Sequence, residues 1–202
     1  MKPREHQPGD RWDRAERALR ARLAQQAELP AEEWEFFRSR LARLLVPEGA
    51  HFLHEGEVER RIAYVVRGLF RLYSRREGRE INLGFDCEDR FVAGYESFVL
   101  RTPSSVAIQA LENSELLAFD HETLEVAYSR HPCWERIGRL MAERETLQRT
   151  RKERELRCLT PQQRYLRLYQ RDLPWLGRVP QYHVASFLGV TPETLSRIRA
   201  RL

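Results

Sequence analysis

The stretch PQYHVASFLGVTPETLSRIRARL, residues 180–202, decides the fold of the C-terminal part of this chain. Val184 and Leu188 are four residues apart, which predicts a helix with one buried stripe, and the small Ala185 lets a second helix pack closely. Gly189 stands where the chain must leave that helix, a position that often requires a positive φ. These signals predict a short helix that ends at a tight turn.

The residues after this turn predict a second helix with a buried edge and a polar face. Thr191-Pro192-Glu193 supplies an N-cap, a first helical residue with preset φ and an acidic first turn. Leu195 and Ile198, three apart, are expected to face inward. Two such helices form a helix-turn-helix, whose second helix enters the major groove of DNA. The candidate DNA-contacting residues are Thr191, Glu193, Thr194, Ser196, Arg197, Arg199 and Arg201. The alternative is an ordinary helical hairpin whose arginines form a solvated face.

Charge is distributed unevenly along the 202 residues. Residues 1–138 contain 21 Lys and Arg against 24 Asp and Glu, whereas residues 139–202 contain 14 against 6. The basic surplus therefore lies in the C-terminal third, as expected of a module that releases counterions from a phosphate backbone. An acidic protein partner would suit the same distribution.

The three cysteines, Cys87, Cys133 and Cys158, are far apart in the sequence and form no CxxC pair. They fit a reducing cytoplasm and argue against a disulfide framework and a cysteine-ligated cluster. No apolar run approaches the ~18 residues of a membrane span, and the Arg-rich start lacks the apolar core of a signal peptide. We expect a cytoplasmic protein with no membrane partner and no cofactor.

The first 50 residues predict helices. Residues 1–12 are polar with two prolines and are expected to be a disordered tail, whereas 13–27 have Ala and Leu at helical spacing. Pro30 opens a second helix. In AEEWEFFRSRLARLL, residues 31–45, apolar side chains repeat at three and four, so this helix is expected to end just before Pro47.

From about residue 49 the pattern changes to short apolar runs separated by Gly and charge. The runs are HFLH, RIAYVV, LFRLYS, INLGF, FVAGY, SVAIQAL and ELLAF. Many short strands at this spacing predict an antiparallel barrel or a jelly-roll-like sandwich, with a hairpin turn at Glu77-Gly78-Arg79.

Pro132 opens a long predicted helix that reaches at least Arg154. Its apolar edge is made by Trp134, Ile137, Leu140, Met141 and Leu147, and Arg144 and Arg151 interrupt the heptad that would continue it. This edge is either a dimer seam or a surface packed on the barrel of the same chain. Thr160-Pro161 then caps a further helix.

The predicted fold class is α+β: an N-terminal antiparallel β-roll with flanking helices, a long connecting helix and a small all-α helix-turn-helix domain lacking a wing. The expected parts are the tail at 1–12, the β-roll sensor domain at 13–131, the connecting helix at 132–157 and the DNA-binding domain at 158–202.

This arrangement, ending in GVTPETLSRIR, resembles the Crp-Fnr superfamily of bacterial transcription regulators over nearly the whole chain. The match is most specific in the E-x-x-S-R pattern, present as Glu193, Ser196 and Arg197. The resemblance implies that these side chains reach base edges in the major groove, with Arg197 on a guanine and Glu193 accepting from a cytosine amine. It also implies a homodimer, with RNA polymerase and an unidentified small-molecule effector as candidate partners.

The loop AGYESFVLRTPSSVAIQAL, residues 93–111, departs from the relatives that bind cyclic nucleotide. Those carry a Glu for the ribose and an Arg for the phosphate, whereas this chain has Gly94 and Ser104 there and retains only Ser105. Without that guanidinium a buried cyclic phosphate lacks its counter-charge unless Arg101 or Arg79 supplies one. We expect no control by cyclic AMP. A pocket for another effector would be lined by Tyr95, Glu96, Ser97, Ser104 and Ser105; the alternative is an ordinary loop.

Two further features separate the chain from its relatives. The sequence stops at Leu202, on the second helix of the motif, so the β-wing of many relatives is expected to be absent and affinity to depend on arginines and a dimer. No cysteine precedes Cys87, which argues against the iron-sulfur sensor of some relatives.

Other chemistry has weak support. His51, His54 and Glu55 form HxxHE, but side chains three apart on a strand are expected to point to opposite faces, so no metal site is predicted. His121, His131 and His183 are scattered, and surface or capping roles are expected. No phosphate loop, nucleophile elbow or paired-carboxylate motif indicates an enzyme.

Two functions remain open. The first is a dimeric regulator that binds double-stranded DNA at a pseudo-palindrome with half-sites about one helical turn apart. The second is a small-molecule sensor or protein-interaction module whose C-terminal domain does not bind DNA and instead contacts an acidic partner.

Overall fold

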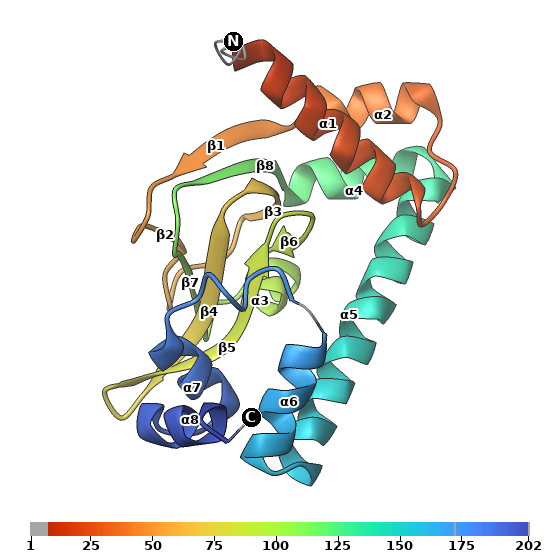
Figure 1. Ribbon diagram of the computed structural model, residues 1–202. Coiled ribbons are helices and arrows are strands. Elements are labelled where there is room, and N and C mark those ends of the chain that lie inside the picture. Colours follow the sequence, from red (N-terminus) through yellow and green to blue (C-terminus); the bar gives the residue numbers. More distant parts are fainter. Residues whose placement is uncertain (1–7, 172, 202) are drawn as a thin grey trace, which may run out of the picture.

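The computed structural model describes residues 8–171 and 173–201. Its centre is an antiparallel β-roll with helices at one end, the long helix α5 along one side and the C-terminal helices at the other end (Figure 1). Over the described residues the roll consists of two four-stranded sheets, ordered β1-β8-β3-β6 and β2-β7-β4-β5. The strands are β1 Ala42–Val46, β2 His51–Leu53, β3 Arg61–Arg67, β4 Leu69–Arg76, β5 Arg79–Cys87, β6 Phe91–Val92, β7 Ala107–Ala110 and β8 Ser114–Asp120.

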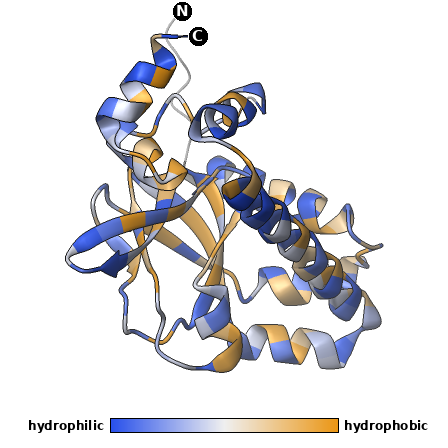
Figure 2. Cartoon of the chain, turned by 90° about the horizontal axis from the view of Figure 1, so that it is seen from below, coloured by the Kyte–Doolittle hydropathy of each residue, from blue (hydrophilic) through white to orange (hydrophobic). Residues whose placement is uncertain are grey.

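The two sheets enclose an apolar interior. Val65, Phe70, Ile108 and Leu116 are fully buried and come from β3, β4, β7 and β8. In Figure 2 the strands of the roll are largely coloured as hydrophobic, whereas the long helix α5 is mostly coloured as hydrophilic. The predicted α+β class with an antiparallel roll and flanking helices is confirmed.

Strands β4 and β5 form the longest hairpin of the roll. Their register runs from Leu69 opposite Cys87 to Arg76 opposite Arg79. The predicted turn at Glu77-Gly78-Arg79 is confirmed, since the two linking residues, Glu77 and Gly78, have φ of 51° and 75°. Positive φ at both central residues is the geometry that matches the twist of the flanking strands.

The N-terminal region corrects two predictions. Helix α1, Pro8–Ala24, includes residues 8–12, which were expected to be disordered; residues 1–7 lie outside the described residues. The reason is that Leu19 and Leu23 bury one face of α1 and Trp12 packs against the same cluster, which extends the helix toward its start.

The second correction concerns residues 31–45, predicted to be one helix. Helix α2, Ala31–Arg38, ends early, and Ala42–Val46 is strand β1, paired with β8 from Ala42 opposite Ala118 to Val46 opposite Ser114. The Leu spacing fits a helix, but pairing with the edge of β8 satisfies the backbone of this segment.

Three more helices flank the roll: α3 Tyr95–Leu100, α4 His121–Arg130 and α5 Pro132–Cys158. The run FVAGY, predicted as a strand, pairs only at Phe91 and Val92 before α3 begins. The long helix at Pro132 is confirmed, and its first half packs through Trp134 and Ile137. Its second half is largely exposed.

The C-terminal region is helical, with α6 Pro161–Gln170, α7 Gln181–Leu188 and α8 Pro192–Arg199. The predicted cap of α6 is confirmed as a capping box between Thr160 and Gln163. Among the described residues no helix is long and apolar enough to cross a membrane.

Candidate nucleic-acid interface

Helices α7 and α8 form the predicted helix-turn-helix. Gly189 closes α7 with φ of 68°, and the backbone N–H groups of Gly189 and Val190 donate to the carbonyls of Ser186 and Ala185, each at 3.0 Å. This is the Schellman arrangement, in which a left-handed residue ends a helix and satisfies its last carbonyls. Thr191 then caps α8 by accepting from the N–H of Thr194 at 3.3 Å.

Helix α8 presents its polar side chains outward, as predicted. Leu195 and Ile198 are buried at 1% and 8% exposure against α7 and α6. Of the seven candidate DNA-contacting residues, Thr194 is half-buried; the exposed ones are Thr191, Glu193, Ser196, Arg197, Arg199 and Arg201. No part of the described chain covers this face.

The charged side chains of α8 lie at the surface. The pKa of Glu193 is lowered by its own backbone N–H at the helix start and by the Thr191 side chain, so it is an ionised acceptor. Among the described residues the side chains of Arg197 and Arg199 make no hydrogen bond or ion pair, although the charge of Arg197 helps to lower the pKa of Glu193. Exposed guanidinium groups of this kind suit phosphate or base-edge acceptors. A surface groove of about 540 Å³ beside α8 is lined by Gln181, Pro192, Leu195, Ser196, Arg199 and Ala200.

The helix-turn-helix is packed on the roll of the same chain. The Phe85 ring of β5 lies 4.7 Å from the Trp175 ring and 5.5 Å from the Phe187 ring of α7, measured between centroids. Leu69 and Cys87 of the hairpin join the same buried cluster as Val184 and Leu195. The β4–β5 hairpin and the C-terminal helices therefore share one apolar core.

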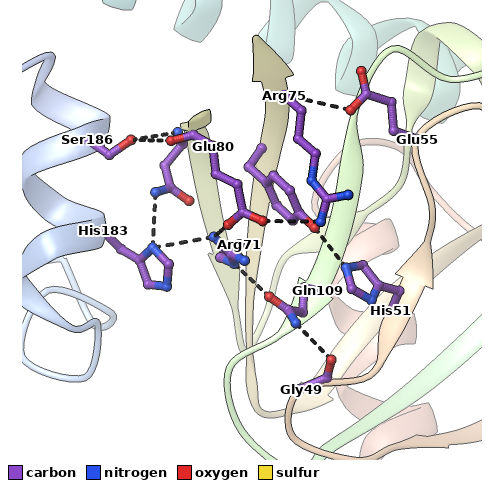
Figure 3. Close-up of polar contacts among 11 residues, drawn as sticks. Gly49, His51, Glu55, Arg71, Arg75, Glu80, Gln109, His183 and Ser186 are labelled. Carbon is purple, nitrogen blue, oxygen red and sulfur yellow. Dashed lines mark hydrogen bonds and ion pairs between the residues drawn. The ribbon is translucent and has the colours of Figure 1, made fainter. Parts of the chain in front are cut away.

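A polar network lies beside this core (Figure 3). Arg71 is buried, and its guanidinium pairs with Glu80 at 2.7 Å and donates to Gln109 at 2.8 Å. His183 of α7 meets the same group: its Nδ1 lies 3.4 Å from Arg71 Nη1 and 3.1 Å from Asn82 Nδ2. Because both neighbours are donors, Nδ1 must be the unprotonated acceptor.

This network corrects the prediction that His183 has a surface or capping role. His183 is 7% exposed, and burial, reinforced by the charge of Arg71, lowers its pKa to about 4. Ser186, one turn further along α7, accepts from Asn82 N–H at 3.0 Å and donates to the carbonyl of Glu80 at 3.2 Å. The other two histidines, His121 and His131, behave as expected: one is at the surface and one caps α5.

Arg178 closes the interface on its other side. Its guanidinium binds both oxygens of Glu88, at 2.7 and 3.0 Å, and also pairs with Glu112 at 2.5 Å. Burial acts to raise the pKa of Glu88, but the bonds from Arg178 lower it overall, so the pair stays charged. The segment before α7 is thus tied to two loops of the roll.

The predicted effector residues do not surround one hollow. Tyr95, Glu96 and Ser105 are exposed, whereas Ser97 and Ser104 are buried. Ser97 accepts from Glu59 N–H at 2.9 Å and donates to Thr102, and Ser104 bonds the backbone of Val106.

Gly94 explains why this loop is closed. A Cβ at this position would lie 2.5 Å from Leu53 Cδ2 and 3.3 Å from Ser104 Oγ, so a Glu side chain would have to displace Leu53. The Gly94 N–H donates to the Glu59 carboxylate at 3.2 Å, which also accepts from the N–H groups of Arg60 and Arg61. The N–H groups of Gly94, Arg60 and Arg61 therefore already donate to the carboxylate of Glu59.

The HxxHE segment also differs from its predicted geometry. The rings of His51 and His54 stack with centroids 4.3 Å apart, because β2 ends at Leu53 and His54 lies in the following turn. His51 Nε2 lies 2.9 Å from the Tyr73 hydroxyl. Within residues 8–171 and 173–201 no group of three or more His, Cys, Asp and Glu is arranged to hold a metal.

A second groove, of about 260 Å³, lies where the roll, α5 and the segment before α7 meet. Its charged lining includes Arg22, Arg90 and Arg144, and its apolar wall includes Phe85 and Trp175. None of the five predicted effector residues lines either groove.

Comparison with known proteins agrees with this geometry. Residues 43–131 match the family model of the cyclic nucleotide-binding domain. No curated protein sequence matches the chain. Solved structures resemble most of it. CLP of Xanthomonas campestris, described as a c-di-GMP-responsive global regulator, has 21% identity and a TM-score of 0.67 and covers 85% of this chain and 91% of its own.

Two further structures resemble the chain over a similar length. FixK2 of Bradyrhizobium japonicum has 19% identity and a TM-score of 0.69 over 80% of this chain and 84% of its own. The catabolite activator protein of Thermus thermophilus has 25% identity and a TM-score of 0.50 over 86% and 84%. The chain therefore shares the fold of these three structures. Within this fold, residues 43–131 are the part that matches the cyclic nucleotide-binding domain family.

Proposed function

We propose that this protein is a sequence-specific regulator that binds double-stranded DNA through α8 and is not controlled by cyclic AMP. The observation that carries the proposal is the exposed polar face of a correctly capped second helix, whose apolar edge is buried in the domain. Arginines on the exposed face of α8 can contact the phosphates and bases of a duplex, whereas arginines engaged in internal contacts could not.

The side chains of α8 divide into two roles. Arg197 is suited to two parallel bonds with a guanine edge, and Glu193 to accepting from a cytosine amine, with Ser196 more permissive. Arg199 and Arg201 are further along the helix and suit phosphate oxygens, which carry affinity without sequence information.

We further propose that the protein acts as a homodimer through α5. Leu147, on the apolar edge predicted from the sequence, is 58% exposed, and Leu140 lies seven residues before it on the same side of the helix. Apolar side chains at heptad spacing are the pattern by which two helices form a seam. A dimer would present two α8 helices to two half-sites.

Independence from cyclic AMP is supported by the loop at residues 93–111. The Ser104 hydroxyl bonds the backbone of Val106, a side chain at position 94 would have to displace Leu53, and Glu59 already accepts from the N–H of Gly94. A cyclic phosphate placed there would meet a carboxylate instead of a guanidinium.

Selection of bound duplexes from a random DNA pool tests the proposal. The expected result is a pseudo-palindrome whose half-sites lie about one helical turn apart, with unchanged enrichment when cyclic AMP is added. Recovery of no preferred sequence would contradict DNA reading, and enrichment that required cyclic AMP would contradict the effector assignment.

A further inference from the structure

The tip of the β4–β5 hairpin is rich in arginine. Arg75 and Arg76 end β4, and Arg79 begins β5 after the turn at Glu77 and Gly78. The side chains of Arg75 and Arg76 are 63% and 66% exposed, and Arg79 is exposed as well. The positive φ values of the turn fix the two strands in register, so Arg76 and Arg79 stand opposite each other.

The acidic neighbours of this tip are partly occupied. Glu80 pairs with the buried Arg71 at 2.7 Å, a shorter contact than its 3.3 Å bond to Arg75. Glu55 lies 4.0 Å from Arg76, a loose contact at the surface. Among the described residues Arg79 has no bonded partner. Exposed ion pairs of this kind contribute little, so a phosphate can take over these guanidiniums at small cost.

The same hairpin is bonded to the helix-turn-helix. Ser186 of α7 bonds the backbone of Asn82 and Glu80, and His183 bonds the Asn82 side chain, all within a few residues of the tip. The tip projects past α7 at the end of the molecule where α8 lies (Figure 1). The position of the three arginines relative to α7 and α8 is therefore fixed by hydrogen bonds and by the shared core.

We propose that this hairpin tip is a second DNA-contacting element, in which Arg76 and Arg79 bind backbone phosphates beside the groove that α8 enters. The inference rests on the proposed DNA binding of α8 and adds a contact from the roll itself. Its ligand is the phosphate backbone of the duplex, so it supplies affinity and orientation but no sequence preference.

This role has a measurable signature. Each phosphate that a protein neutralises releases counterions. The slope of the logarithm of the DNA-binding constant against the logarithm of the salt concentration then becomes steeper by about 0.9. Two contacts per hairpin should therefore change the slope by about two for each bound protomer. A contribution to base reading would instead alter affinity differently for different sequences.

The test is fluorescence anisotropy with the duplex obtained by selection, measured at several salt concentrations. Arg76 and Arg79 are both changed to Gln in one variant and to Lys in a second. The matched control changes Arg17 and Arg20 to Gln, since both are exposed on α1, at the opposite end of the molecule (Figure 1). Thermal unfolding of each variant confirms that it is folded.

The expected result is that the Gln variant binds selected and scrambled duplexes more weakly by a similar factor, about tenfold or more at moderate salt, and has a shallower salt slope. The Lys variant should retain most of the slope, because its charge is kept. The control should match the wild type. A Gln variant that equals the control, or binds more tightly, overturns the inference while leaving α8 binding intact. A wild-type protein with no sequence preference would instead overturn the proposed function.

Discussion

His183 is a buried residue of α7 that contacts both Arg71 and Asn82 of the β4–β5 hairpin. It is neutral because burial and the guanidinium of Arg71 disfavour its charged form. A proton on Nδ1 would face Arg71 and the Asn82 amide donors, while Glu80, already bonded to Arg71, offers the nearest negative charge. Protonation of His183 would therefore weaken the packing of α7 on the hairpin.

This dependence predicts a pH effect on stability. The pKa of His183 is lowered from 6.5 to about 4 in the folded protein, so its stabilising effect is complete above pH 6.5 and is lost as pH falls through 4. Between pH 7 and pH 4 the wild type should lose roughly 2–3 kcal/mol of unfolding free energy that His183→Gln does not lose. Urea denaturation of both proteins at pH 7, 5.5 and 4 measures this difference, and a constant gap between them would refute the assignment.

At the scale of elements, the contact between α7 and the β4–β5 hairpin is what places the helix-turn-helix on the roll. Phe85, Trp175 and Phe187 supply its aromatic centre, and Arg178 links the preceding segment to Glu88 and Glu112. The outward face of α8 is directed away from the core of this interface. The same contact that orients α8 also brings the basic hairpin tip beside it.

Removing the aromatic centre should loosen the C-terminal helices. Trp175→Ala should lower the unfolding free energy by roughly 3–5 kcal/mol, because a buried aromatic ring is replaced by a cavity. Tyr169→Ala, at a position 67% exposed, is the control and should change stability by about 0.5 kcal/mol or less. Thermal or urea unfolding measures both effects. Equal losses of unfolding free energy for the two substitutions would contradict a stabilising role of Trp175.

The elements also show what local sequence can predict. The α7–α8 motif was predictable because its ends are set by local residues. Gly189 ends α7, and Thr191 and Pro192 begin α8. Strand β1 was not, since the spacing of Leu41, Leu44 and Leu45 fits a helix and only its partner β8, some 70 residues later in the register, decides otherwise. The contact of His183 with Arg71 joins residues 112 apart, and no local pattern carries it. The run FVAGY was predicted to be one strand, but α3 begins only three residues after Val92. The composition of so short a run does not show where the strand ends and the helix begins.

At the scale of the whole molecule, α5 connects the roll to the helix-turn-helix and leaves part of its surface uncovered. Its first turns are buried through Cys133, Trp134 and Ile137, while Leu147 and Leu156 are 58% and 45% exposed. These two leucines are nine residues apart and so lie on opposite sides of the helix. Only the side of Leu147 continues the apolar edge predicted for a dimer seam.

Substitution on this side should separate the protomers. Leu147→Arg should shift a dimer to a monomer at micromolar concentration, and should weaken DNA binding because bivalent contact is lost. Leu156→Arg adds the same charge on the other side of α5 and should leave the dimer intact. Analytical ultracentrifugation of the two variants tests the seam, which is disproved if both remain dimers or if the wild type is a monomer.

The central claim is that α8 reads base edges with Arg197, and a base-pair scan of the selected duplex tests it most directly. Each position is substituted in turn and the binding free energy is measured for the wild type, Arg197→Ala and Arg199→Ala. We predict that Arg197→Ala abolishes discrimination of about 1–3 kcal/mol at one base pair per half-site, whereas Arg199→Ala weakens every duplex alike. A uniform loss for Arg197→Ala, with the wild-type preference retained at every position, would contradict the account.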